Sequence, residues 1–239
     1  MPEPAYGRIL LKLSGEILAG KKGFGVDPLK ASAIAEEVNS VREMGVEVGL
    51  VIGGGNIIRG ERAELRGMDR VSADYLGMLA TIINAITVQD ALEKQGCETR
   101  TLTAISISQL AEPYIRRRAL RHLERGRVII VAGGTGNPYF TTDTAAVLRA
   151  IEIEADVVLK GTKVDGVFDR DPEKFKSAKQ FSKLTFEKVI ENELRVMDLT
   201  AVTLCKENNL PIVVFNVNES GNLKRVVSGE KIGTRVEKS

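Results

Sequence analysis

Glycine clusters follow two apolar runs of the sequence. Residues 48–52 lead into Gly53-Gly54-Gly55-Asn56, and residues 128–132 lead into Gly133-Gly134-Thr135-Gly136. Because glycine carries no side chain, the backbone N–H groups of such a turn approach a ligand closely, and successive N–H groups bind anions. Two such turns in one sheet indicate two phosphorylated ligands, or one phosphoryl group passed between two holders.

Lysines lie at the ends of two further apolar runs. Lys12 lies near the end of residues 8–13, just before Ser14-Gly15, and Lys160 directly follows residues 157–159. His122 is the single histidine of the chain, which excludes a multi-histidine zinc site. It lies in an arginine-rich segment with helical spacing, which argues against a Ser-His-Asp triad. Phosphoryl transfer needs no imidazole, because positioning and electrostatic stabilisation supply most of its catalysis. The sequence therefore favours phosphoryl transfer.

Apolar runs alternate with helical patterns, and this rhythm predicts the fold. A chain of βαβ units forms a mostly parallel sheet covered on both faces, and its ligands gather at the carboxyl ends of the strands. Lys12, Lys160 and both glycine clusters fall at those ends. We therefore predict an α/β fold, a three-layer α/β/α sandwich with a mostly parallel central sheet. The expected strands include residues 46–52, 99–103, 127–132, 155–159 and 212–215.

Two helices have clear sequence markers. Asp27-Pro28 is typical of an N-cap followed by proline at the first helical position, and Gly45 is typical of the C-terminal end. A longer helix is expected over residues 73–95. Its apolar stripe consists of Leu76, Leu79, Ile83 and Ile86.

Length and composition place the chain among soluble proteins. It has 239 residues and a net charge of +2, and no linker divides it, so we predict a single domain over residues 1–239. This charge gives no indication of a nucleic-acid partner. No uninterrupted apolar stretch reaches the ~18 residues of a membrane span, and the start lacks a secretory pattern. Cys97 and Cys205 have no metal-ligand or redox spacing. We predict buried, inert thiols, a cytoplasmic location and no membrane partner.

Some of the candidate residues have structural explanations that remain open. Asp74, Asp143 and Asp198 each precede an apolar-periodic segment, where an aspartate commonly caps a helix. The arginine-rich segment 116–127 is expected to be a solvated helix face, with a surface for an anionic effector or partner as the alternative. RNA binding is not favoured there, because no aromatic residues interleave the arginines.

The segment after Lys12 approaches a P-loop pattern without completing it. Residues 15–21 have the required glycine and lysine spacing, but Lys22 stands where Ser or Thr would bind magnesium. Gly23-Phe24-Gly25 follows in place of a helix. A P-loop is therefore not predicted.

Taken together, these motifs resemble the bacterial UMP kinase (uridylate kinase) family of the amino acid kinase superfamily. The resemblance runs from the first strand to near the end of the chain and implies the amino acid kinase fold. The Thr135-Gly136-Asn137-Pro138…Thr141-Thr142-Asp143 element is specific to the UMP branch. The other matching segments are residues 10–16, 51–56, 59–60, 77–81 and 165–168.

The resemblance implies transfer of the γ-phosphate of ATP to UMP, with Mg²⁺ accompanying ATP. It also implies a homohexamer that GTP activates and UTP inhibits. Two alternatives remain: a non-catalytic uridine-nucleotide sensor, and a related superfamily kinase that acts on a carboxylate.

The family pattern assigns the reacting groups residue by residue. Lys12 would bridge the donor and acceptor phosphates, Lys160 would stabilise the γ-phosphate, and Asp143 would orient the lysines or magnesium. Arg59 would lie beside the ATP phosphates, and Asp198 is a weaker candidate for the same network. No residue is assigned as a direct magnesium ligand. The implied ATP-binding residues are Lys12, Leu13, Ser14, Gly15, Gly55, Arg59, Thr162, Phe168 and Asp171.

The UMP site and the regulatory site are also implied by resemblance. Asp74 would bind the ribose hydroxyls, Gly54 the UMP phosphate, and Thr135 and Asn137 the base. The full UMP set is Gly54, Asp74, Thr135, Gly136, Asn137, Pro138, Tyr139, Phe140, Thr141 and Thr142. The regulatory set is Gly20, Lys21, Lys22, Gly23, Phe24, Gly25, Asp90, Arg100 and Arg127.

Overall fold

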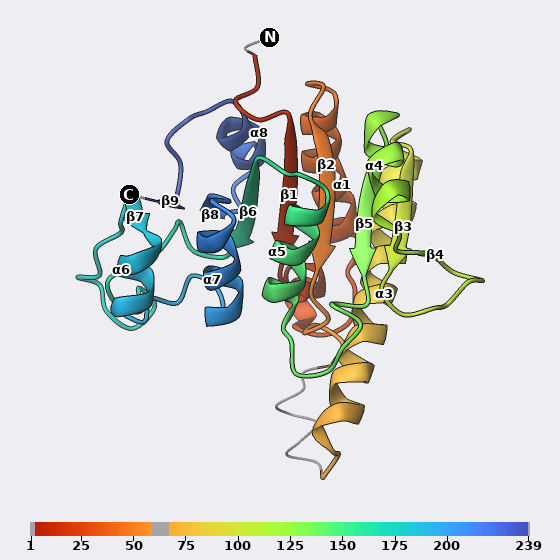
Figure 1. Ribbon diagram of the computed structural model, residues 1–239, viewed down its shortest axis with the longest axis horizontal. Coiled ribbons are helices and arrows are strands. Elements are labelled where there is room, and N and C mark those ends of the chain that lie inside the picture. The colour runs from red at the N-terminus through yellow and green to blue at the C-terminus, as the bar shows by residue number, and fades with distance from the viewer. Residues whose placement is uncertain (1–2, 59–66, 239) are drawn as a thin grey trace.

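A computed structural model describes residues 3–58 and 67–238 (Figure 1). Its nine-stranded sheet has the order β4-β3-β5-β2-β1-β6-β8-β9-β7, with β9 antiparallel to β8 and every other pairing parallel. The predicted mostly parallel sheet is therefore confirmed. The strands are β1 (Arg8–Leu13), β2 (Glu47–Ile52), β3 (Thr99–Thr103), β4 (Glu112–Pro113), β5 (Val128–Ala132), β6 (Val157–Thr162), β7 (Lys183–Thr185), β8 (Ile212–Asn216) and β9 (Thr234–Glu237).

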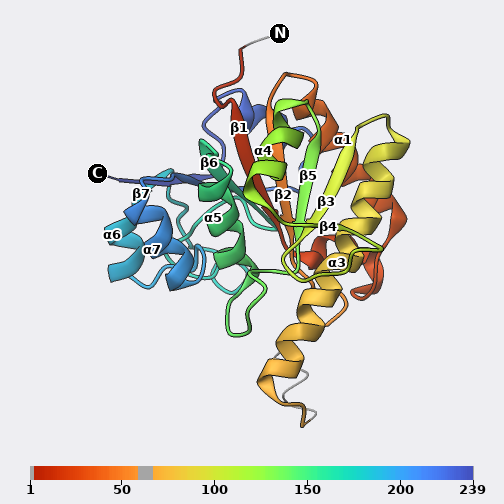
Figure 2. The same ribbon diagram turned by 45° about the vertical axis from the view of Figure 1, so that its right-hand side comes forward.

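Helices cover both faces of the sheet and bury a separate apolar core on each (Figures 1 and 2). One face packs against α1, α3 and α8, and the other against α4, α5, α6 and α7. The three-layer sandwich is confirmed. The helices are η1 (Gly15–Lys22, a 3₁₀ helix), α1 (Pro28–Arg42), α3 (Arg70–Lys94), α4 (Arg116–Glu124), α5 (Thr142–Glu152), α6 (Phe186–Glu191), α7 (Leu199–Glu207) and α8 (Asn222–Val227).

The alternation of side chains along β1 decides which face Lys12 joins. Ile9, Leu11 and Leu13 enter the core under α1, whereas Leu10 enters the core under α5. Lys12 shares the face of Leu10, because successive strand residues point to opposite sides of a sheet. This parity directs its ammonium group toward α5.

Helix α3 begins earlier than expected, at Arg70. The side chain of Asp69 caps it by accepting from Val71 N at 3.0 Å and Ser72 N at 3.1 Å. The interpretation of Asp74 as an N-cap is therefore wrong. Figure 2 shows the first turns of α3 projecting past the carboxyl edge of the sheet.

The apolar stripe predicted for α3 faces outward. Leu79, Ile83 and Ile86 are 42%, 50% and 37% exposed, while Met78, Ile82 and Val88 pack inward. Both sides of this helix are apolar, and by length and composition alone it could cross a membrane. Its inner side packs on the sheet, as in the core helix of a globular protein.

Local features elsewhere match most sequence expectations. Asp27 caps α1, with Pro28 at its first position. Cys97 and Cys205 are buried free thiols as predicted, and burial raises the pKa of Cys205 to about 12. The 3₁₀ helix η1 follows β1 in place of the α-helix that a P-loop requires. β6 runs on to Thr162, so Lys160 lies within the strand and not after it.

Candidate functional site

A buried carboxylate lies between two ammonium groups at the carboxyl edge of the sheet. Lys12 on β1 and Lys160 on β6 are register partners on adjacent parallel strands. Asp143, in the first turn of α5, is 2.5 Å from Lys12 Nζ through Oδ1 and 2.8 Å from Lys160 Nζ through Oδ2. Lys160 Nζ also donates to the carbonyl of Val196 at 2.5 Å. The structure thus brings three of the predicted reacting groups into direct contact.

Burial and charge oppose each other in this cluster. Burial raises the pKa of the Asp143 carboxyl, but the Lys12 and Lys160 ammonium groups outweigh it and leave the pKa below its ordinary 3.8. Burial lowers the pKa of Lys160 below its ordinary 10.5, and the attraction of Asp143 offsets only part of that shift. The start of a helix also favours the Asp143 carboxylate. The cluster has one positive charge in excess, which suits a site for phosphates.

The first glycine turn presses against the end of β1. Gly53 N donates to the carbonyl of Leu13 at 2.9 Å. A Cβ on Gly15 would collide with the carbonyl oxygen of Gly53, so only glycine fits there. The N–H groups of Gly54 and Gly55 donate to no acceptor within the described residues. This turn therefore presents two consecutive amide donors at the rim.

The second glycine turn has the same property. Gly133, Gly134 and Gly136 have φ of 78°, 60° and 84°, which favour glycine, and Gly136 N donates to the carbonyl of Gly133 at 3.0 Å. The N–H groups of Gly134 and Thr135 donate to no acceptor in the part of the chain that the structure describes. Among the described residues, the rim thus carries two pairs of free amide donors.

The segment after the second turn folds back over α3. Thr135 Oγ1 donates to the carbonyl of Asn137 at 3.1 Å and accepts from Asn137 N at 3.2 Å. Asp74 of α3 accepts from Tyr139 N at 2.7 Å and pairs with Arg70 at 3.0 Å. Asp74 therefore anchors residues 135–142, which were predicted with it as a single UMP site. Gly136, Pro138 and Phe140 lie along the same segment, and the Phe140 ring is exposed.

The start of α5 joins that segment to the charged cluster. Thr141 is the N-cap, accepting from Asp143 N at 3.0 Å, so the interpretation of Asp143 as an N-cap is wrong. Thr142 Oγ1 lies 3.4 Å from the place a Cβ on Gly53 would take, so the start of α5 lies beside the first glycine turn. Asp198, the N-cap of α7, accepts from the hydroxyls of Thr141 and Thr144.

The predicted adenine-nucleotide residues lie at the end of β6 and in the segment after it. Phe168 and Asp171 line a cavity of about 520 Å³ whose other wall is formed by residues 192–195. This volume lies within the range of small-molecule sites. Sequence reasoning missed residues 192–195, because nothing in their local pattern marks them. Thr162, by contrast, uses its hydroxyl in a turn with Val164.

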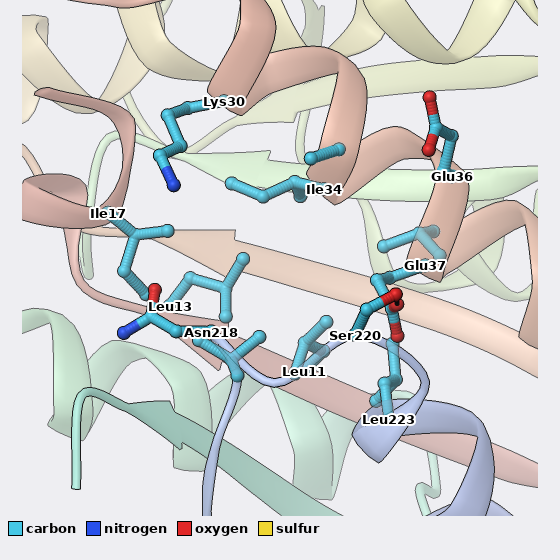
Figure 3. Close-up of a pocket in the computed structure, with 13 residues that line it drawn as sticks. Leu11, Leu13, Ile17, Lys30, Ile34, Glu36, Glu37, Asn218, Ser220 and Leu223 are labelled. Carbon is cyan, nitrogen blue, oxygen red and sulfur yellow. Dashed lines mark hydrogen bonds between the residues drawn. The ribbon is translucent and has the colours of Figure 1, made fainter. Parts of the chain in front are cut away.

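Leu13 lines a different cavity. Its side chain lies on the α1 face and helps line a cavity of about 110 Å³ between α1, β1 and the segment before α8 (Figure 3). Its carbonyl already accepts from Gly53 N. Ser14 caps η1, with Oγ 3.4 Å from Glu16 N. Arg59 lies outside the described residues, so its predicted place beside the ATP phosphates stays a prediction.

The predicted regulatory residues fall in two separate places. Residues 20–25 include the last residues of η1 and the turn that follows it. They lie beside the first glycine turn, since Gly25 N donates to the carbonyl of Asn56 at 2.9 Å. Within this set Lys21, Lys22, Gly23 and Phe24 are exposed, and Gly20 has a φ of 56°. Arg100 and Arg127 lie at the amino ends of β3 and β5, the opposite edge of the sheet. Asp90 pairs with Lys94 at 2.5 Å on α3.

No cluster of acidic, histidine and cysteine side chains suited to a metal is found in the described residues. Both oxygens of Asp143 already face ammonium groups. A magnesium ion would therefore depend on nucleotide phosphates and water for most of its ligands.

The chain is similar to known proteins over nearly its whole length. UMP kinase from Bacillus anthracis is 44% identical, with a TM-score of 0.94 over 97% of this chain and 96% of that one. UMP kinase from Ureaplasma parvum is 37% identical, with a TM-score of 0.92 over 97% and 98%. Uridylate kinase from Archaeoglobus fulgidus is 27% identical, with a TM-score of 0.74 over 95% and 99%. The model of the amino acid kinase family matches residues 7–216, and the chain belongs to that family.

Proposed function

We propose that this chain transfers the γ-phosphate of ATP to UMP and releases ADP and UDP. The observation that carries the proposal is the Lys12–Asp143–Lys160 cluster, which lies at the same sheet edge as two turns with free amide donors. A phosphoryl group moving between two anions needs positive charge and N–H dipoles along its path. The similarity to UMP kinases over nearly the whole chain supports UMP as the acceptor.

The reaction requires no general base from the protein. A phosphate oxygen of UMP is already anionic at neutral pH and attacks the γ-phosphorus of ATP. The new O–P bond forms while the bond to the β-phosphate oxygen breaks, and the electron pair leaves with ADP. Lys12 neutralises charge shared by donor and acceptor, Lys160 stabilises the γ-phosphate, and Asp143 holds both ammonium groups in place.

The binding roles follow the two sides of the cluster. On the ATP side we assign Lys12, Leu13 through its backbone, Ser14, Gly15, Gly55, Arg59, Thr162, Phe168 and Asp171. On the UMP side we assign Gly54, Asp74 and residues 135–142. The anchor from Asp74 to Tyr139 supports treating the latter group as one site.

Magnesium would enter with ATP. When bound, the ion shields the charge of the β- and γ-phosphates. Asp143 is the carboxylate of the cluster, and it contributes by positioning the two lysines.

We further propose that the chain works as a single domain over residues 1–239 in a cytoplasmic homohexamer that GTP activates and UTP inhibits. The outward apolar stripe of α3 supports self-association, because a row of exposed large side chains is typical of a protein interface. Residues 20–25, Asp90, Arg100 and Arg127 are the proposed regulatory contacts.

An acceptor profile tests the proposed activity. ADP release is measured with ATP, magnesium and, separately, UMP, CMP, dTMP, acetylglutamate and aspartate. The proposal requires UMP to give the highest kcat/KM, by about a hundredfold or more over the amino acids. Equal rates with CMP and UMP, activity only on an amino acid, or nucleotide binding without ADP release would overturn it.

A further inference from the structure

Two polar residues interrupt the buried face of α3. Thr81 is 3% exposed and Asn84 is fully buried, and they lie one turn apart. Burying a polar side chain costs free energy unless its hydrogen bonds are made. Here those bonds go to the two glycine turns.

Thr81 holds the second turn. Its hydroxyl donates to the carbonyl of Met78 at 2.6 Å and accepts from Gly133 N at 2.8 Å. Gly133 directly precedes Gly134 and Thr135, whose N–H groups donate to no acceptor among the described residues. The position of that amide pair is therefore fixed by a side chain of α3.

Asn84 holds the first turn. Its Nδ2 donates to the carbonyl of Gly53 at 2.7 Å and to Asn56 Oδ1 at 2.7 Å, and its Oδ1 accepts from Asn56 Nδ2 at 3.0 Å. Gly53 directly precedes Gly54 and Gly55, the other free amide pair. The helix also leaves no space behind the turn, since a Cβ on Gly54 would lie 2.7 Å from the carbonyl oxygen of Gly77.

Asn56 extends this chain of hydrogen bonds to residues 20–25. Its Nδ2 donates to the carbonyl of Gly25 at 2.8 Å, while Gly25 N donates to the Asn56 carbonyl at 2.9 Å. The proposed regulatory segment is thus hydrogen-bonded to the first turn through Asn56, whose side-chain amide also bonds that of Asn84.

We propose that Thr81 and Asn84 are positioning residues for phosphoryl transfer. Thr81 sets the amide pair on the UMP side, and Asn84 sets the amide pair that faces the transferring phosphoryl group. Neither residue contacts a reacting atom. The inference rests on the proposed UMP kinase activity for its kinetic consequences, but its structural part stands independently of that activity.

The matched variants are Thr81→Val and Thr81→Ser. Valine has the shape of threonine without the hydroxyl, so Gly133 N loses its acceptor, whereas serine keeps it. We expect Thr81→Val to raise the KM for UMP about tenfold. The KM for ATP should stay within about twofold, and Thr81→Ser should restore the KM for UMP. Thr99→Val is the control, because Thr99 is also buried. Its hydroxyl donates to the carbonyl of Cys97 at the amino end of β3, the edge of the sheet opposite the glycine turns.

Asn84→Asp tests the proposed role of Asn84 in positioning the first glycine turn. The carboxylate keeps the shape of the amide but cannot donate to the carbonyl of Gly53. We expect kcat to fall about tenfold or more with both substrates saturating. Asn84→Asp should also weaken the link to residues 20–25.

Amide hydrogen exchange of the ligand-free variants provides a readout that does not depend on catalysis. Thr81→Val should speed exchange at residues 133–137 and not at 53–57, and Asn84→Asp should do the reverse and add residues 23–25. If the unmodified chain fails to phosphorylate UMP but this exchange pattern holds, only the proposed function fails. If Thr81→Val and Thr99→Val give the same KM values and the same exchange, the positioning role is overturned.

Discussion

Lys12 and Lys160 are register partners on adjacent parallel strands, and the Asp143 carboxylate bridges their ammonium groups. Two like charges side by side are unfavourable in a buried site unless an opposite charge lies between them. The register of β1 and β6 thus supplies two cations in one place, and the first turn of α5 supplies the anion that allows them to stay there.

This arrangement predicts a non-additive stability cycle. Asp143→Asn leaves two buried ammonium groups without a counter-ion and should lower the free energy of unfolding by about 3 kcal/mol. Lys12→Met together with Asp143→Asn removes one of the repelling charges and should recover part of that loss. Urea unfolding of the single and double variants measures the difference. Additive losses in the double variant would contradict the account.

The lowered pKa of Lys160 predicts the alkaline limb of the activity. Because burial favours the neutral amine, Lys160 should lose its proton below the ordinary pKa of 10.5, and kcat should fall as the pH rises through that lowered value. Between that lowered pKa and 10.5, the unfolded chain keeps the Lys160 proton that the folded chain has lost. Across this pH window the contribution of Lys160 therefore makes the free energy of unfolding rise with pH. A pH profile of kcat from 7 to 11 measures the limb. Lys160→Arg, which stays charged, should remove it, and an identical limb in that variant would exclude Lys160 as its source.

Asp74 is predicted to act on UMP binding through residues 135–142. Asp74→Ala removes the acceptor of Tyr139 N and should raise the KM for UMP about tenfold or more, because the segment loses its anchor to α3. The KM for ATP should change little. Glu36→Ala serves as the control, because Glu36 is an exposed carboxylate on α1. Equal rises in both KM values would show that Asp74 acts on the fold in general.

The outward stripe of α3 is predicted to mediate assembly. Ile83→Glu places a charge in the middle of the stripe and should lower the assembled mass seen by analytical ultracentrifugation, because an unpaired charge is costly in a packed interface. Leu29→Glu on α1 is a matched control, since Leu29 is 79% exposed outside the stripe. Equal masses for Ile83→Glu and the unmodified chain would rule out the stripe as the interface.

The gathering of chemistry at one sheet edge was predictable from the sequence. Lysines and glycines that follow apolar runs must meet there once the strands are parallel, and the structure places Lys12, Lys160 and both turns together. The roles of individual aspartates were harder to predict from the sequence. Asp74 and Asp143 both lie in the first turns of their helices and not at the caps, which are Asp69 and Thr141. Local sequence does not distinguish between such neighbouring candidates.

The supports behind the site were not predictable. Asn84 lies in no motif, and the segments that contain Asn56 and Thr81 do not show which groups these side chains bond. Their hydrogen bonds join segments up to 52 residues apart. The direction of the α3 stripe was also hidden, because a helix with apolar residues on both sides does not reveal which side meets the sheet. Residues 192–195 reach the cavity beside Phe168 only through the tertiary fold.

The most direct test of the central claim is the kcat of Lys12→Met with saturating ATP, magnesium and UMP. Methionine keeps the buried stem and removes the charge that is proposed to lie between donor and acceptor. The account predicts a fall of about a hundredfold to a thousandfold with the secondary structure unchanged, while Lys206→Met, at a surface ion pair, keeps its activity. A kcat for Lys12→Met close to that of Lys206→Met would contradict it.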